Sequence, residues 1–230
     1  MSRYEVRKSI TSCHVTIELL RELECYIYKT TKELSANEDD LNFTVALEDE
    51  YGEETLSSVQ DYKRSKIPNN VHTIKLRASN YRENLCVEVS FSEKQNYSYI
   101  RIEIDGEGAK EKAHGILSTV SEHVKEHKNL NFIFYGGHNY VLPMIVGGVF
   151  GGSIDILSGN DLSTYNFYSL VLLVSILTYG LFKLFSPYSE LDTKKNENVQ
   201  KSIKWCLNGL AGVFIFGVLA YYLRNLVIGF

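Results

Sequence analysis

The stretch VHTIKLRASNYRENLCVEVSFSEKQNYSYIRIEI, residues 71–104, decides the fold of the first half of this chain. It contains three runs in which apolar and polar residues alternate, 71–78, 85–91 and 97–104, and short polar turns separate them. Alternation with a period of two is typical of strands that bury one face. Three such strands joined by short turns predict an antiparallel sheet.

The alternation also assigns the side chains to two faces of that sheet. The apolar face takes Ile74, Leu76, Leu85, Val87, Val89, Phe91, Ile100, Ile102 and Ile104. The opposite face takes Thr73, Lys75, Arg77, Tyr97, Tyr99, Arg101 and Glu103. One face therefore packs in a core, and the other presents charged and aromatic side chains to solvent.

Further elements flank this sheet. The run LNFTVAL, residues 41–47, alternates in the same way and predicts another strand, whereas residues 53–63 are expected to form a short helix. Residues 16–34 and 109–128 carry apolar residues at helical spacing, with Ala109, Ala113, Ile116, Leu117, Val120 and Val124 in the second. Residues 1–136 are thus expected to form an α+β domain, an antiparallel sheet with helices on one face.

Basic residues gather around the predicted strands. Residues 62–82 contain six Lys and Arg residues and no acid. The candidate ligand-binding set is Lys63, Arg64, Lys75, Arg77, Arg82, Arg101, Tyr97 and Tyr99. Basic groups interleaved with aromatic rings suit phosphates and stacked bases, or anionic lipid headgroups beside a membrane. The alternative is a solvated basic face, balanced by the acidic residues in 48–54.

The second half of the chain has a different composition. Residues 1–138 hold 18 Lys and Arg, 23 Asp and Glu and all six His, whereas residues 139–230 hold only six basic and five acidic residues. The bilayer core, about 30 Å thick, takes ~20 helical residues. Uncharged stretches of that length predict spans at about 139–157, 164–185 and 203–223, so residues 137–230 are expected to form a transmembrane domain.

The first of these stretches is the weakest candidate, since it is short and contains Pro143 and four glycines; a re-entrant segment is the alternative. Five Lys lie in residues 183–204 and none lies in residues 158–165. The positive-inside rule therefore places the second connection in the cytoplasm. With three spans the α+β domain is also cytoplasmic, and the protein is a multi-pass protein of the inner cell membrane. Two spans would place the domain outside, for which the charged start MSRYEVRKSI offers no export signal.

A stripe of glycines marks the first stretch. Gly147, Gly148, Gly151 and Gly152 give two overlapping G-x-x-x-G pairs, which allow close approach of another helix. The stripe is a candidate contact in a homo-oligomer or a pore, or else packs helices within one chain. Asp155 follows, either as a charge at a pore mouth or as an ordinary carboxylate at the membrane interface.

Chemical motifs are sparse. His123 and His127 have i, i+4 spacing but no third ligand, and the four cysteines form no CxxC pair. Phosphate-loop, nucleophile-elbow and kinase signatures are all missing. We therefore expect no enzyme activity, no cofactor and no metal.

The whole layout, an α+β domain followed by three candidate spans with the run IVGGVFGG in the first, resembles that of small prokaryotic membrane effectors of anti-phage, abortive-infection immunity. The resemblance implies that a cytoplasmic activating protein, or an anionic signal such as a nucleotide or nucleic acid, triggers the soluble domain. Homo-oligomerisation in membrane lipid and permeabilisation would follow. The alternatives are a passive membrane-anchored binding or scaffolding module and a membrane-tethered enzyme.

Overall fold

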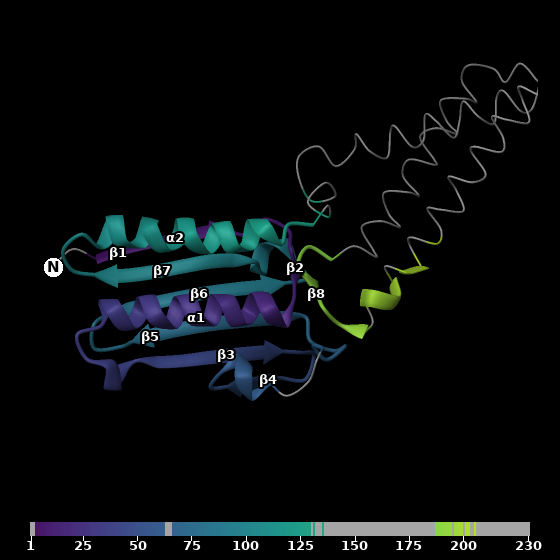
Figure 1. The fold of residues 1–230 in the computed structure, drawn as a ribbon, viewed down its shortest axis with the longest axis horizontal. Helices are drawn as coiled ribbons and strands as arrows, with labels where there is room; N and C mark the ends of the chain where they lie inside the picture. Colours follow the sequence, from purple (N-terminus) through teal and green to yellow (C-terminus); the bar gives the residue numbers. More distant parts are fainter. Residues whose placement is uncertain are drawn as a thin grey trace, which may run out of the picture. The chain divides into compact units, whose positions relative to one another are not determined.

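The computed structural model describes residues 3–62, 66–129, 131, 135, 187–194, 196–199, 201, 202 and 205. Met1–Phe132 and Pro187–Asn196 belong to one compact unit, which we call the α+β unit. Its sheet and helices are drawn in colour in Figure 1. The sequence pattern predicted that the α+β domain ends at residue 136 and that residues 187–196 belong to the transmembrane domain. The structure instead includes Pro187–Asn196 in the α+β unit, which the sequence did not indicate.

A six-stranded antiparallel sheet forms the centre of the unit. In spatial order the strands are β1 (Arg3–Ser9), β7 (Tyr99–Asp105), β6 (Leu85–Ser92), β5 (Thr73–Asn80), β3 (Asn42–Glu48) and β4 (Glu53–Leu56). Every neighbouring pair is antiparallel. The α+β class and the antiparallel sheet predicted from residues 71–104 are therefore confirmed.

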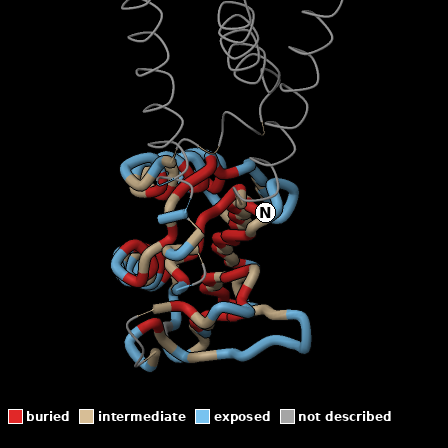
Figure 2. Tube along the Cα trace, turned by 90° about the vertical axis from the view of Figure 1, so that its right-hand side faces the viewer, coloured by how far each residue is buried: buried red, intermediate tan, exposed pale blue. Residues whose placement is uncertain are grey.

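Two helices, α1 (Ile17–Leu34) and α2 (Ala109–Glu126), lie side by side on one face of the sheet (Figure 1). Buried residues concentrate between this helix layer and the strands (Figure 2). All nine residues predicted for the apolar face of the central strands are buried there, as are the six apolar positions predicted for α2. Burial of this shared core is the main stabilising term for the unit.

Local signals explain where the helices begin. The side-chain hydroxyl of Thr16 accepts a hydrogen bond from the backbone N–H of Leu19 at 3.2 Å, which caps α1. Gly108 precedes α2 with a φ of 67°, a left-handed conformation that glycine adopts without the strain of a Cβ. Both helices start within a residue of the predicted positions.

Four short elements, strand β4 and three 3-10 turns, differ from the sequence prediction or were not part of it. Residues 53–63, expected to be helical, instead contain strand β4 and a single turn of 3-10 helix, η2 (Val59–Asp61). The carboxylate of Asp49 accepts hydrogen bonds from the N–H groups of Tyr51 and Gly52, which closes a hairpin between β3 and β4. Tyr97 ends the 3-10 turn η3 (Gln95–Tyr97), so β7 starts two residues later than predicted. A third 3-10 turn, η1 (Glu38–Asp40), follows α1.

Strand β1 was not predicted. Its sequence RYEVRKS contains only two apolar residues in the alternating positions, Tyr4 and Val6, and both are half-buried against the core. The strand forms because the edge of β7 supplies seven consecutive residue partners for it, from Arg3 opposite Asp105 to Ser9 opposite Tyr99.

The regions with the predicted spans are described only in part. None of the helices in the described ranges has both the length and the apolar character that a membrane crossing requires. The stretches 139–157 and 164–185 lie outside the described residues, as does 203–223 apart from Trp205. The glycine stripe Gly147, Gly148, Gly151 and Gly152 and the adjacent Asp155 also lie outside them.

Candidate functional site

The face of the sheet opposite the two helices is the surface that the sequence marked for ligand binding, and we call it the open face. The strand register places its side chains in cross-strand rows. One row runs Arg7, Arg101, Glu88, Arg77 and Thr44 across β1, β7, β6, β5 and β3. The next row runs Ser9, Tyr99, Ser90, Lys75 and Ala46. Four predicted residues, Lys75, Arg77, Tyr99 and Arg101, are thus brought together in two adjacent rows.

Two of the other predicted residues, Tyr97 and Arg82, lie away from these rows. Tyr97 lies in η3 and is 58% exposed, outside the strand rows. Arg82 lies in the turn between β5 and β6, beyond the end of the open face. Lys63 and Arg64 lie outside the described residues. Of the eight predicted residues, four therefore cluster on the open face, two lie away from that cluster, and two fall outside the described residues.

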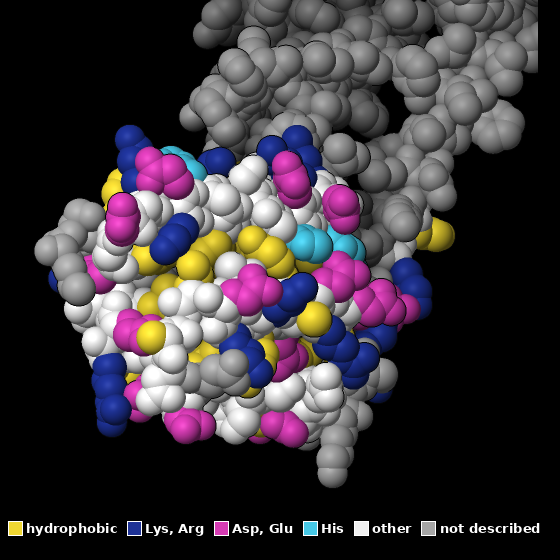
Figure 3. Space-filling view, turned by 60° about the vertical axis from the view of Figure 1, so that its left-hand side comes forward, with side chains coloured by type: hydrophobic (Ala, Val, Ile, Leu, Met, Phe, Trp, Pro, Cys, Tyr) yellow, Lys and Arg dark blue, Asp and Glu magenta, His cyan; other side chains and the backbone are white. Residues whose placement is uncertain are grey.

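Carboxylates neutralise much of the positive charge on the open face. Lys75 Nζ lies 3.0 Å from Glu48 Oε2, and Arg101 contacts Glu5 at 2.9 Å and Glu103 at 3.2 Å. Arg3 also pairs with Glu103. Lys and Arg side chains are likewise interspersed with Asp and Glu on the face of the unit drawn in Figure 3. An anion that bound at Lys75 or Arg101 would have to compete with an existing partner.

Tyr99 is held in place on the open face by two neighbours. Its hydroxyl donates a hydrogen bond of 2.5 Å to Glu88 Oε1, and the guanidinium of Arg7 lies 3.9 Å from the centre of its ring. Burial, and then the adjacent carboxylate, raise the pKa of the Tyr99 hydroxyl to about 12. The ring is therefore neutral at physiological pH and already stacked with a cation.

Arg77 is the cation with unused hydrogen-bonding capacity. Its buried Nε has no hydrogen-bond partner among the described residues, and its guanidinium lies 6.0 Å from the ring centre of Tyr81. The thiol of Cys86, on the adjacent strand, is free, and burial raises its pKa. A buried N–H without a partner is costly, so Arg77 is the best anion-binding candidate within the open face.

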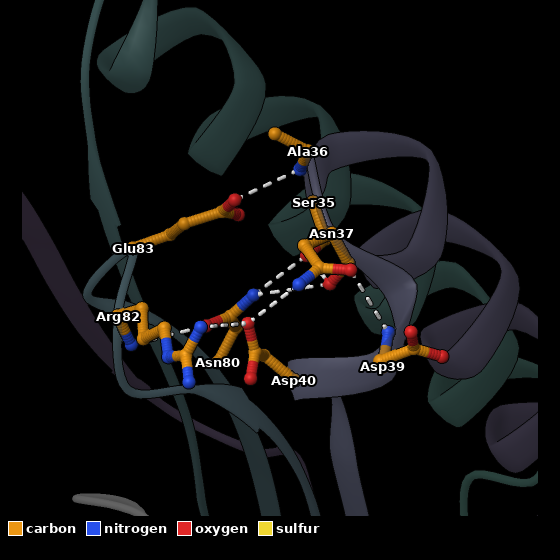
Figure 4. Close-up of polar contacts among 8 residues, drawn as sticks. All are labelled: Ser35, Ala36, Asn37, Asp39, Asp40, Asn80, Arg82 and Glu83. Atoms are coloured by element: carbon orange, nitrogen blue, oxygen red, sulfur yellow. Dashed lines mark hydrogen bonds and ion pairs between the residues drawn. The ribbon is translucent and has the colours of Figure 1, made fainter.

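Arg82 has a structural role at the far end of the β5–β6 hairpin (Figure 4). Its guanidinium pairs with Asp40 at 3.1 Å, and its backbone N–H donates to Asn80 Oδ1 at 3.0 Å. The buried amide of Asn80 in turn donates to the hydroxyl of Ser35 at 2.7 Å, after the end of α1. The carboxylate of Glu83 accepts from the N–H of Ala36 at 2.9 Å. These contacts join the hairpin turn to the end of α1 and leave Arg82 apart from the open face.

A second functional feature, which the sequence did not reveal, is the segment Pro187–Thr193, which we call the docked segment. It contains strand β8 (Glu190–Leu191), which pairs in parallel with β2 (His14–Val15). Backbone hydrogen bonds hold it along its length: Tyr188 N–H to Glu93 O, Ser189 N–H to Ser92 O, Glu190 N–H to Cys13 O, and Asp192 N–H to Val15 O, all at 2.8–3.1 Å. The segment therefore adds a strand to the α+β unit from a distant part of the chain.

Side chains bury the docked segment as well. Leu191 is fully buried in the core, and the hydroxyl of Tyr188 donates to the carbonyl of Ile10 at 2.6 Å. Ser189 and Ser98 share a buried hydroxyl–hydroxyl hydrogen bond of 3.1 Å. Burial and satisfied polar groups together make this segment an integral part of the unit.

An ion pair lies at the centre of this docking. Glu190 is only 5% exposed, and its Oε2 lies 3.6 Å from Nδ1 of His14. Interaction with the Glu190 carboxylate raises the pKa of His14, which burial would otherwise lower. Asp192 raises it further and Lys66 opposes the shift. The docked arrangement therefore favours the protonated imidazole.

The docked segment also joins the point where the chain leaves the unit. The side-chain amide of Asn131 donates to the carbonyl oxygen of Pro187 at 2.9 Å, and the N–H of Asn129 donates to Ser12 O at 3.3 Å. Sequence reasoning missed this arrangement because PYSELDT has too few apolar residues for a strand prediction. Its one signal was the pair Tyr188 and Leu191 within an otherwise polar connection.

Neither a metal site nor a similar protein helps to define the function of these features. Within the described ranges, no group of three or more His, Cys, Asp or Glu side chains is arranged to hold a metal ion. His123 packs its ring against Tyr26, with 5.9 Å between the ring centres. No known protein family, curated protein or solved structure matches this chain.

Proposed function

We propose that this protein is a membrane sensor–effector of anti-phage defence. The α+β unit, in the cytoplasm, receives a signal on its open face, and the apolar stretches of the second half assemble in the inner membrane and permeabilise it. The observation that carries the proposal is the docked segment. It lies between the second and third apolar stretches of the sequence, and it is built into the core of the α+β unit.

This arrangement supports coupling between the two halves. A passive anchor requires only one membrane stretch and a flexible linker. Here the unit holds the chain before the first apolar stretch, at Asn131, after the second, at Pro187, and before the third, at Thr193. A conformational change in the unit that alters its contacts with Asn131, Pro187 and Thr193 would act on one end of each of the three apolar stretches. Coupling of this kind requires an element with two arrangements, and we propose that the docked segment is that element.

The open face supports a partner rather than a small catalytic substrate. Its charges are mostly paired, so a protein or polymer with a matching pattern of charges suits it better than a single free phosphate. The Nε of Arg77 has no hydrogen-bond partner among the described residues, and the guanidinium of Arg7 lies over the ring of Tyr99. An activating protein with an acidic patch, or a nucleic-acid strand that stacks beside Tyr99, would use both.

The same paired charges favour the second candidate function, a membrane-anchored scaffold. Exposed ion pairs contribute little energy and are common on inert surfaces. In this alternative the docked segment fixes the orientation of the unit at the membrane but does not transmit a signal to the apolar stretches.

Induced expression distinguishes the two functions. The effector should depolarise cells within minutes of full expression or triggering, as reported by a membrane-potential dye, and the scaffold should not. Gly148→Leu is the test variant because a bulky side chain on the predicted glycine stripe should prevent close helix packing. Val171→Leu, in the second apolar stretch, is the matched control. If the native chain and both variants leave the membrane potential unchanged while accumulating equally, the effector proposal is wrong and the scaffold stands.

A further inference from the structure

Strand β1 leaves one long edge of the sheet open. In the described part of the chain it pairs only with β7, along all seven of its residues, and it forms the end of the sheet. Arg3, Glu5 and Arg7 are exposed, whereas Tyr4 and Val6 are half-buried against the core. The opposite edge, β4, has only four residues. An edge strand presents unpaired backbone N–H and C=O groups, which another strand can use.

The side chains of β1 are complementary to their own antiparallel copy. A twofold axis through Val6, perpendicular to the sheet, places Val6 opposite itself and Glu5 opposite the copy's Arg7. The same register places Tyr4 opposite Lys8, and Arg3 opposite Ser9. Directly opposite side chains lie on one face of a sheet, so both Glu–Arg pairs form on the open face and the Val–Val pair on the helix face.

Neighbouring registers are unfavourable. An axis through Glu5 brings two carboxylates together and sets Arg3 against Arg7. An axis through Arg7 brings two guanidinium groups together and leaves Glu5 opposite Ser9. Like charges placed directly opposite each other destabilise a strand pair, so these two registers are disfavoured. An axis through Tyr4 would also pair Arg3 with Glu5, but it joins only three residues of each β1, whereas the Val6 register joins all seven.

We propose that two copies of this protein associate edge to edge through β1, in the Val6 register, to form one continuous antiparallel sheet. The inference rests on the α+β unit alone and stands whether or not the membrane half permeabilises lipid. One seven-residue strand pair is smaller than a standard protein interface, so the contact is weak between free molecules. Confinement of both copies to one membrane would raise their effective concentration and strengthen it.

Disulfide formation at the axis tests the register. Directly opposite residues in antiparallel strands have Cα atoms about 4.5–5.5 Å apart, close enough for a disulfide. We expect Val6→Cys in the full chain to form covalent dimers in whole-cell lysates treated with copper phenanthroline. Arg3→Cys and Ser9→Cys should each fail to link alone but should link to each other when co-expressed. The native chain, whose Cys25 is exposed, measures linking through random collision.

Charge reversal tests the pairing. In the Val6→Cys background, Glu5→Arg or Arg7→Glu should lower the dimer yield about tenfold, because both symmetric pairs become repulsive. The double reversal should restore the yield. The double reversal also places the Glu at position 7 opposite Arg101, because position 7 of β1 pairs with Arg101 of β7. Rescue by the double reversal separates lost pairing from misfolding.

Two results would overturn the proposal. One is a Val6→Cys dimer yield no higher than that of the native chain or of Ser9→Cys alone. The other is a double reversal that remains as low as the single reversals while the protein resists proteolysis as the native chain does. Membrane depolarisation is measured separately, so failure of the strand pairing leaves the proposed function to its own test.

Discussion

The side-chain amide of Asn131 donates a hydrogen bond of 2.9 Å to the backbone carbonyl of Pro187, 56 positions further along the chain. The α+β unit therefore holds both ends of residues 132–186. A chain segment that leaves and returns on one side of a membrane crosses it an even number of times. The two apolar stretches between these residues, 139–157 and 164–185, are thus expected to cross together, which disfavours the re-entrant alternative for the first.

Cysteine labelling tests this topology. Ser158→Cys, between the first two stretches, should react with a membrane-impermeant maleimide added to intact cells. Lys194→Cys should react only after permeabilisation, because the three-span topology predicts that the connection after the docked segment is cytoplasmic. Lys194 is the suitable position since its side chain is exposed, whereas the neighbouring Thr193 is buried and would resist the reagent on either side. Labelling of Lys194→Cys from outside would contradict the three-span topology.

The docked segment should stabilise the α+β unit. Leu191→Ala removes a fully buried side chain from the core and is expected to lower the free energy of unfolding by about 2–4 kcal/mol. Tyr51→Ala, at a site that is 89% exposed, is the control and should change it by less than about 0.5 kcal/mol. Thermal denaturation of the full chain in detergent measures both. Equal melting temperatures for the two variants would show that the segment is dispensable for the fold.

Docking should weaken as the pH rises. Because Glu190 raises the pKa of His14 above its ordinary value of 6.5, protonated His14 stabilises the folded unit. This stabilisation is complete below about pH 6.5 and is lost as the pH passes through the raised pKa. We expect the native chain to melt above His14→Gln at pH 6 and level with it at alkaline pH. A difference that is constant across this range would mean that the ion pair does not contribute.

Arg77 should dominate any binding of anions to the open face. Its Nε has no partner among the described residues, whereas Lys75 and Arg101 already contact carboxylates. We expect Arg77→Gln to weaken the binding of an oligothymidine probe about tenfold, the size of one charge-assisted hydrogen bond. Arg82→Gln removes the same charge away from the face and should leave binding unchanged. Equal affinities for these two variants would show that the open face does not bind the probe.

The sequence alone predicted those strands and helices in which the spacing of apolar residues matches the residues that the fold buries. The alternation of Ile74 to Ile104 identified the central strands and their buried faces, because a half-buried strand repeats with a period of two. The spacing of Ala109 to Val124 identified α2 and its buried side for the equivalent reason in a helix. The segregation of charge after residue 138 likewise marked a second part of the chain with different composition.

Tertiary structure alone decided the features that depend on partners distant in sequence. Strand β1 has two apolar residues and forms because β7 offers it an edge. Within segment Pro187–Thr193, Glu190–Leu191 form strand β8 only because β2, more than 170 positions earlier, pairs with it. The paired state of Lys75 and Arg101 depends on Glu48 and Glu5, which the register brings beside them. Short polar segments carry too little periodicity to predict pairing, so their structure is set by the neighbours that fold around them.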